Sequence, residues 1–355
     1  MNVLKTTVKK LLYHGGYYHA LGWLDGLRYP GSRLVILVYH NISDGREFDT
    51  GAHHPFQIRP VLTRSVFDLH LRILKQSYDV VDLETGLARL TADPKSDRMV
   101  AITFDDGYRS FLEIAFPLLQ AYGIPATVFL PTDFVGQKRF FWWDRLNQAV
   151  YLLQEQPPDP SALGEILGES TASGLLSSRA DRLGAIRYLQ ELERTLIPLS
   201  DAKRDGMIAA LEALLPQGSR ARITPEPMLN WNQVRELSKR NVHFGSHTCS
   251  HLTFGVAAPA QVESELKASR AAIEDCLQKP ATGFAFPYGA DLESYRKAVP
   301  ILRRRGYTHA RTTAWAYNTS STDRFLLNRA HIDFQPSATL ARRDMVNNFL
   351  MRSEA

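Results

Sequence analysis

The chain has 355 residues, of which 44% are hydrophobic and 22% are charged, and its formal net charge is +5. This length suits one large α/β domain or two smaller ones, and the composition excludes disordered and fibrous proteins. The excess positive charge lies mainly in residues 1–40, which hold five basic residues against the single acidic residue Asp25. Nucleic-acid binding needs a broad basic face, so we expect no nucleic-acid partner.

Residues 1–30 form a basic segment with apolar residues at helical spacing, but they contain no continuous apolar core typical of a signal peptide. The apolar run at 34–39 is too short to cross a bilayer. We therefore expect a cytoplasmic protein. The first helix would either pack on the domain or lie on the inner face of the cytoplasmic membrane as a peripheral contact. Two cysteines, Cys249 and Cys276, are too few for a disulfide framework, which fits a reducing compartment.

From residue 31 to 355 we expect one domain in which strands alternate with helices. Strands are expected at 33–40, 79–83, 99–104, 126–130, 241–246, 283–286, 308–312 and 324–332. Residues about 137–228 show helical periodicity without a convincing strand, which predicts a helical insertion. Alternating strands and helices indicate parallel βαβ units, and this number of strands favours a barrel over an open sheet. No dinucleotide-binding or Walker motif follows any expected strand.

Two adjacent carboxylates, Asp105 and Asp106, follow the strand at 99–104 and precede Gly107. In a parallel α/β barrel, functional side chains lie at the carboxyl ends of the strands. Asp-Asp-Gly is also a good turn sequence, so this motif alone fits a plain turn as well as an active site.

His247 and His251 follow the strand at 241–246 and are four residues apart. If this segment opens a helix, the two imidazoles share one face, which is a spacing typical of metal ligands. Two imidazoles and one carboxylate leave open positions on an ion, as catalytic divalent metal sites require. Cys249 would face away from the pair, so we do not expect it to be a ligand.

The third motif is Pro287-Tyr288-Gly289, which also follows an expected strand. It is either a proline turn or a loop that presents the Tyr288 N–H to a developing oxyanion.

In this order, TFDDG, HTCSH and FPYG resemble the NodB-homology polysaccharide deacetylases of carbohydrate esterase family 4, over about residues 30–136 and 229–335. The resemblance implies an α/β fold, a distorted (β/α)7 barrel, and a divalent metal, usually Zn²⁺, with Co²⁺ or Ni²⁺ as alternatives. It also implies hydrolysis of N-acetyl groups from an N-acetylated glycan or a lipid-linked sugar (a glycolipid) in surface-polysaccharide synthesis. The alternatives are an O-deacetylase or deformylase on the same scaffold and an inactive glycan-binding module.

By position, the resemblance gives Asp105 the role of general base and makes Asp106, His247 and His251 the metal ligands. The Tyr288 N–H would be the oxyanion donor.

The general acid has two candidates. The segment LVYHNISD resembles the opening of the poly-N-acetylglucosamine deacetylase branch, in which an N-terminal Tyr-His motif carries the acid. This favours His40, with His331 as the alternative. Many members have an arginine where this chain has Ala285, so another group must hold Asp105, and Arg329 is the candidate.

The run RFFWWDRL at 139–146 is unusually aromatic. Trp142 and Trp143 could stack on a sugar beside Pro287, or they could anchor the insertion in its own core. No sequence feature defines an oligomeric state.

Overall fold

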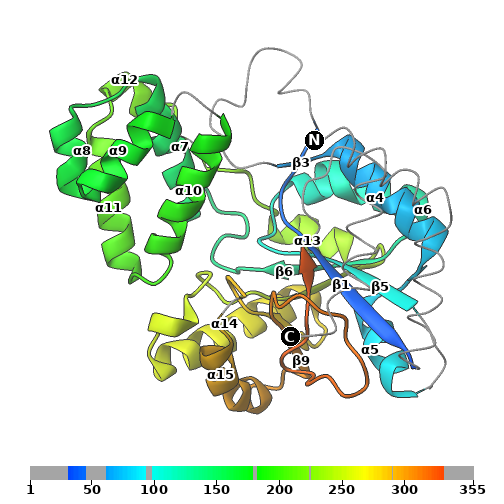
Figure 1. Ribbon diagram of the computed structural model, residues 1–355. Coiled ribbons are helices and arrows are strands. Elements are labelled where there is room, and N and C mark those ends of the chain that lie inside the picture. Colours follow the sequence, from blue (N-terminus) through cyan, green and yellow to red (C-terminus); the bar gives the residue numbers. More distant parts are fainter. Residues whose placement is uncertain are drawn as a thin grey trace.

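A computed structural model describes residues 31–44, 61–92, 98–178, 182–223, 225–289 and 291–331 (Figure 1). The basic segment at 1–30 and everything beyond residue 331 lie outside this part of the chain. Within it, no helix combines the length and the apolar character needed to cross a membrane.

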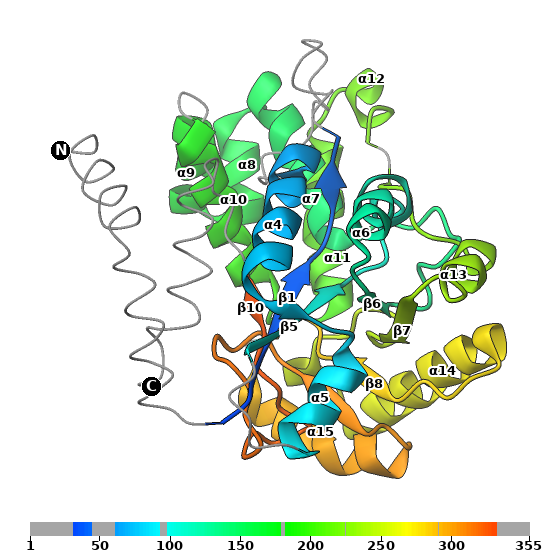
Figure 2. The ribbon, with the colours of Figure 1, turned by 90° about the vertical axis from the view of Figure 1, so that its right-hand side faces the viewer.

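The centre of the protein is an eight-stranded sheet with the order β10-β1-β5-β6-β7-β8-β9, in which β4 also pairs with β5. Every strand pair of this sheet is parallel. Figure 2 shows that the sheet is strongly curved, in the manner of a half-barrel. The expected (β/α) barrel architecture is therefore confirmed. The strands are β1 (Arg33–Tyr39), β4 (Asp79–Val80), β5 (Arg98–Phe104), β6 (Ala126–Leu130), β7 (Val242–Ser246), β8 (Gly283–Ala285), β9 (His309–Arg311) and β10 (Ala330–His331).

Both faces of the sheet are buried, as parallel sheets require. On β1, Leu34 and Ile36 pack into the barrel interior, whereas Val35 and Leu37 pack outward against the helical layer. Helices outside the sheet provide the crossovers between parallel strands. They are α4 (Arg64–Ser77), α5 (Leu83–Ala92), the π-helix η1 (Phe111–Ala115), α6 (Phe116–Tyr122), α13 (Trp231–Leu237), α14 (Pro259–Leu277) and α15 (Leu292–Arg304), with the 3-10 turn η2 (Phe254–Val256). A separate two-stranded sheet joins β2 (Ile42–Ser43) to β3 (Leu62–Thr63).

The strand expected at 324–332 is much shorter in the structure, because its residues pair with two different strands, β9 and β1. The Leu327 N–H donates to Ala310 O of β9, whereas Ala330 pairs with Leu37 of β1. The segment therefore crosses the gap between β9 and β1 and can form a regular strand only at its end, β10.

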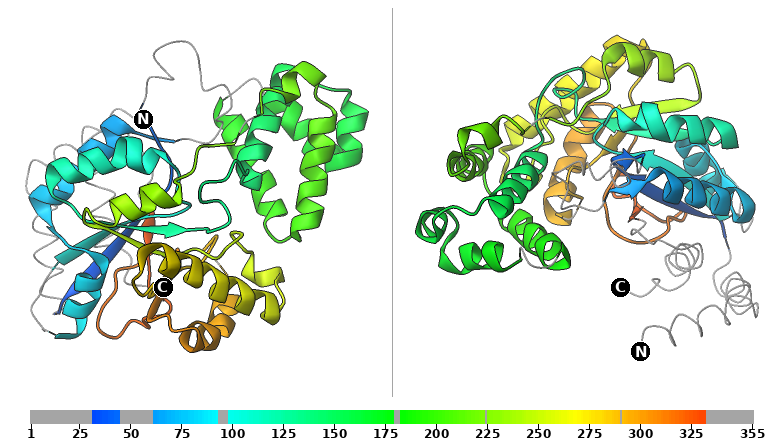
Figure 3. Two further views of the ribbon diagram at one scale, coloured as in Figure 1. Left: turned by 180° about the vertical axis from the view of Figure 1, so that it is seen from behind. Right: turned by 90° about the horizontal axis from the view of Figure 1, so that it is seen from above.

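The region between β6 and α13 is helical. Figures 1 and 3 show its helices as a lobe beside the sheet. Its apolar residues form a core of their own, built around Leu146, Leu163 and Leu189. The helices are α7 (Trp142–Glu155), α8 (Pro160–Leu167), α9 (Glu169–Ser178), α10 (Arg182–Leu196), α11 (Asp201–Ala213) and α12 (Gln217–Arg220).

Candidate functional site

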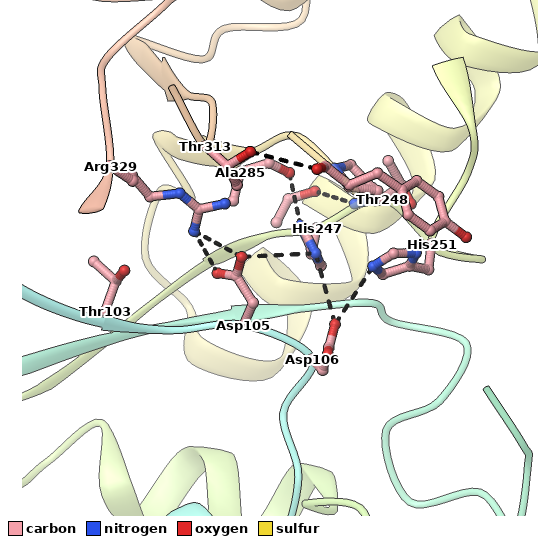
Figure 4. A network of polar contacts seen from close by, with 12 residues as sticks. Thr103, Asp105, Asp106, His247, Thr248, His251, Ala285, Thr313 and Arg329 are labelled. Atoms are coloured by element: carbon pink, nitrogen blue, oxygen red, sulfur yellow. Dashed lines mark hydrogen bonds and ion pairs between the residues drawn. The ribbon is translucent and has the colours of Figure 1, made fainter. Parts of the chain in front are cut away.

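The two adjacent aspartates lie in a sharp turn at the end of β5. The Asp105 N–H donates to Tyr39 O at 2.9 Å, which continues the pairing of β5 with β1. Asp106 and Gly107 then adopt left-handed backbone conformations, with φ of 71° and 72°. Glycine adopts this region readily, and aspartate is one of the few other residues that do so at times. As a result the two carboxylates diverge: Asp105 faces Arg329, and Asp106 faces the two histidines (Figure 4).

The histidine pair lies in a loop, so the two imidazoles do not share a helix face, the condition under which the sequence spacing was interpreted. Thr248 and His251 have positive φ values of 65° and 60°, which an α-helix of L-residues cannot accommodate. The loop is held by Glu265 of α14, which accepts a hydrogen bond from the Cys249 N–H at 2.7 Å. The fold still brings the two imidazoles together, with ring centroids 4.8 Å apart and the ring planes at 82°.

Asp106, His247 and His251 form a buried cluster that fits a divalent cation. Their ligand atoms all lie within 4.8 Å of one another. Asp106 Oδ1 is 3.7 Å from His247 Nε2 and 3.5 Å from His251 Nε2. His247 Nδ1 lies 2.7 Å from Ala285 O, and donation to this carbonyl leaves the lone pair of Nε2 facing the cluster. Burial lowers the pKa of both imidazoles, which favours the neutral form that binds metals.

Cys249 lies in the same loop but does not join this cluster. Burial raises the pKa of its thiol to about 11, so it stays protonated near neutral pH. The thiolate is the form that binds metal, which makes Cys249 a poor ligand.

Arg329 holds Asp105 from the segment that precedes β10. Its Nη1 donates to both carboxylate oxygens, at 2.8 and 2.7 Å (Figure 4). Its Nε donates to Thr312 O at 2.7 Å. Arg329 is fully buried and Asp105 is 3% exposed. Burial alone would raise the Asp105 pKa, but Arg329, followed by His247 and His40, lowers it well below the ordinary value. Asp105 is therefore an ionised proton acceptor.

The loop of Tyr288 follows β8 and closes over His251. Tyr288 has a φ of 62°, and its ring stands perpendicular to the His251 imidazole at 4.6 Å. Its hydroxyl accepts a hydrogen bond from Trp142 Nε1 at 2.8 Å. The Tyr295 hydroxyl donates to Pro287 O at 2.9 Å and fixes the start of the loop. Within the described chain no residue accepts a hydrogen bond from the Tyr288 N–H, as an oxyanion donor requires.

The two tryptophans of α7 join the insertion to this site. Trp142 is 9% exposed and Trp143 is 5% exposed, and both belong to the core of the insertion. Trp143 stacks on Phe141 at 4.5 Å and meets the His251 ring edge-on at 4.6 Å. Their remaining surface forms a wall of the site.

Together these side chains line a cavity of about 140 Å³. His40, exposed at the end of β1, is part of the lining. His331 pairs through its backbone with Val38, and its side chain lies outside the described part. The lining consists of His40, Asp105, Asp106, Trp142, Trp143, Ile197, His247, His251, Phe286, Tyr288, Thr313 and Arg329.

Three of these lining residues were not expected from the sequence, and one of them, Phe286, directly precedes the predicted Pro287 motif. Thr313 lies just beyond the end of β9, the kind of position that identified the other motifs, so a signal was present. Ile197 follows α10 in the insertion, and no motif in the neighbouring sequence indicates that it lines the pocket.

Comparisons with known proteins agree with this fold. The family model for polysaccharide deacetylase matches residues 92–160 and 212–310, on either side of most of the insertion. The Bacillus subtilis protein YxkH, provisionally named a polysaccharide deacetylase, is 29% identical over 119 residues, which are 33% of this chain and 38% of YxkH. The matched region thus spans well under half of that relative.

Solved structures with the same fold include the Streptococcus pyogenes deacetylase PplD in complex with acetate, at a TM-score of 0.55 and 17% identity over 89% of this chain and 99% of that one. The de-N-acetylase from Aggregatibacter actinomycetemcomitans has a TM-score of 0.52 and 18% identity over 88% of this chain and 100% of that one. IcaB from Ammonifex degensii has a TM-score of 0.50 and 17% identity over 88% and 98%. At these identities the likeness concerns the fold. In both comparisons the chain is similar to polysaccharide deacetylases.

Proposed function

We propose that this protein is a metal-dependent hydrolase that removes N-acetyl groups from an amino-sugar glycan or a lipid-linked sugar. The observation that carries the proposal is one small buried pocket in which an ionised Asp105 lies beside the cluster of Asp106, His247 and His251. A proton acceptor next to a three-residue cation site is the arrangement that metal-assisted hydrolysis needs.

The cation would be held by Asp106, His247 and His251, with Zn²⁺ favoured by the mixed nitrogen and oxygen donors and Co²⁺ or Ni²⁺ as alternatives. When bound, such an ion polarises a carbonyl and makes water more acidic. His247 is oriented to bind the ion through Nε2, because the hydrogen bond to Ala285 O fixes its tautomer and its orientation.

The remaining steps belong to the side chains of the pocket. Asp105 takes a proton from the water that attacks the acetyl carbonyl, while Arg329 keeps its carboxylate ionised and in place. The Tyr288 N–H donates to the oxyanion that develops on the carbonyl oxygen. As the C–N bond breaks, the amine leaving group gains a proton from a general acid. His40, which lines the pocket, is the favoured donor, with His331 as the alternative.

The finer assignment concerns the substrate and its place in the cell. The Tyr-His pair at the end of β1, Tyr39-His40, supports a place near the poly-N-acetylglucosamine deacetylases. A role in surface-polysaccharide synthesis at the inner face of the cytoplasmic membrane, with the basic segment 1–30 as a peripheral contact, is part of the same proposal.

An acetate-release assay tests the activity. Purified protein loaded with Zn²⁺ or Co²⁺ should release acetate from N-acetylglucosamine oligomers, and Asp105→Asn should abolish the release. Asp133→Asn is the matched control, because Asp133 follows β6 but is 47% exposed and lies outside the pocket. Turnover by Asp105→Asn equal to that of the unaltered enzyme would show that Asp105 is not the base. Exclusive release from O-acetylated or N-formylated sugars would replace the N-deacetylase with an O-deacetylase or a deformylase.

Metal analysis separates an enzyme from an inactive binding module. His251→Ala should lose the bound metal, whereas Cys249→Ser should keep it. A metal-loaded protein that binds oligomers without releasing acetate would be the binding module. If His251→Ala retains a full equivalent of metal, the cluster is not the metal site.

A further inference from the structure

A second cavity, of about 500 Å³, lies next to the catalytic pocket. The two cavities share four wall residues: Trp142, Trp143, His251 and Tyr288. The rest of its lining comes largely from the insertion, including Phe140 just before α7 and Asp205 on α11. The aromatic wall around His251 therefore has the catalytic pocket on one side and this larger cavity on the other.

The sizes of the two cavities suggest that they bind different parts of one substrate. Sites that bury a whole small ligand usually measure roughly 300–1,000 Å³. The catalytic pocket, at about 140 Å³, is too small for that and can take only the reacting part of a substrate. The rest of a glycan must lie outside it, and the neighbouring cavity of about 500 Å³ is large enough to receive it.

The charges in the larger cavity nearly cancel. Its lining holds four arginines and three carboxylates, namely Arg139, Arg145, Arg204, Arg220, Asp201, Asp205 and Glu212. Arg145 donates to both oxygens of Glu212, at 2.5 and 2.6 Å, and Arg204 pairs with Asp201. Paired charges neutralise one another and still offer donors and acceptors to hydroxyl groups, so this surface suits a neutral polyol better than a phosphate.

Aromatic side chains complete the lining. Phe134, Phe140 and Trp142 contribute to it, and the Arg204 guanidinium lies over the Trp142 ring at 4.8 Å from its centroid. Flat apolar faces beside paired polar groups can contact both the C–H face and the hydroxyl edge of a sugar ring.

We propose that this cavity is an accessory subsite that binds a neighbouring sugar ring of the glycan whose N-acetyl group enters the catalytic pocket. The inference rests on the proposed deacetylase function and adds that the substrate is an oligomer, part of which is held by the helical insertion. The enzyme should accordingly prefer chains to single sugars.

Two variants test the subsite from opposite directions, and each has a matched control. Phe140→Ala removes an aromatic face, with Lys138→Ala as the control in the same loop. Asp205→Trp adds bulk to the cavity from an exposed position on α11, with Lys203→Trp as the control on the same helix. Neither control residue lines the cavity.

The measured quantity is kcat/KM for acetate release from an N-acetylglucosamine tetramer divided by kcat/KM for the monomer. We expect a ratio well above one in the unaltered enzyme, a fall of about tenfold in Phe140→Ala and Asp205→Trp, and no change in the two controls. A ratio near one in the unaltered enzyme, or a ratio that is the same in all variants, would overturn the subsite while leaving the deacetylase intact.

A binding measurement keeps the two proposals distinguishable if no substrate is turned over. Tetramer affinity is then determined by calorimetry on the metal-loaded chain. Binding weakened about tenfold by Phe140→Ala but not by Lys138→Ala would support the subsite although the deacetylase function had failed. If Phe140→Ala binds the tetramer as tightly as the unaltered protein does, the subsite is overturned as well.

Discussion

Removing the guanidinium of Arg329 should deprive Asp105 of its only contacting cation in the described chain, so Arg329→Met tests how the base is controlled. Burial alone raises the pKa of Asp105, and Arg329 is the strongest of the groups that lower it. A contacting opposite charge shifts a carboxyl pKa by roughly 1–3 units. The acid limb of the kcat/KM profile should therefore move to higher pH by a similar amount, because Asp105 acts only when ionised.

The same substitution should also destabilise the fold. Breaking a buried ion pair by removing one partner costs about 3–5 kcal/mol, because the other charge stays buried without compensation. The depressed pKa of Asp105 contributes stability that is fully present above the unfolded-state value of about 3.9 and is lost as the pH falls. The stability difference between the unaltered protein and Arg329→Met should therefore be largest near neutral pH and shrink under acidic conditions.

The assay combines pH profiles of acetate release with urea unfolding at several pH values. Arg329→Lys should keep most of the acid limb in place, because it retains the charge. Arg311→Met is the buried-arginine comparison, since Arg311 is fully buried and interacts electrostatically with Asp105 without the direct hydrogen bonds that Arg329 makes, so it should move the acid limb less. An acid limb that stays in place in Arg329→Met, or that moves equally in Arg311→Met, would refute the assignment of Arg329 as the group that holds the base ionised.

Three further outcomes follow from contacts near the site. Trp142→Phe removes the 2.8 Å hydrogen bond to the Tyr288 hydroxyl and should lower kcat by up to about tenfold with the metal content unchanged, as steady-state kinetics can show. Gly289→Ala combines a φ of 70° with a Cβ that would overlap the Thr313 side chain, so thermal unfolding should reveal a loss of about 1–3 kcal/mol. Arg311→Met should be neutral or stabilising in the same measurement, because Arg311 Nε and Nη1 are buried without partners in the described chain.

Much of the site could be predicted because its residues follow strands. Asp105, Asp106, His247 and Tyr288 each lie just beyond a strand that is apolar enough to recognise, and parallel strands bring such positions to one edge. Arg329 could be suspected for a different reason. Ala285 removes the arginine that the family resemblance supplies, so another cation had to be near Asp105.

Other features depend on tertiary packing that local sequence does not encode. The loop of His247 and His251 has helical spacing, but its left-handed residues are held by Glu265 from a later helix. The hydrogen bond between Trp142 and Tyr288 joins residues 146 positions apart, and it depends on how the insertion docks against the barrel. Neither hydrophobic periodicity nor any sequence motif predicts how the insertion docks.

The bond between Asp105 and Arg329 also sets an order of events during synthesis. The two residues are separated by 224 positions, so a nascent chain completes β5 long before the ribosome has added the arginine. Until then, the carboxylate has no counter-charge from the segment before β10, and burying it would be costly. The growing chain thus gains its oriented base only when almost the whole barrel has emerged, and translation products that stop before Arg329 should be inactive and readily degraded.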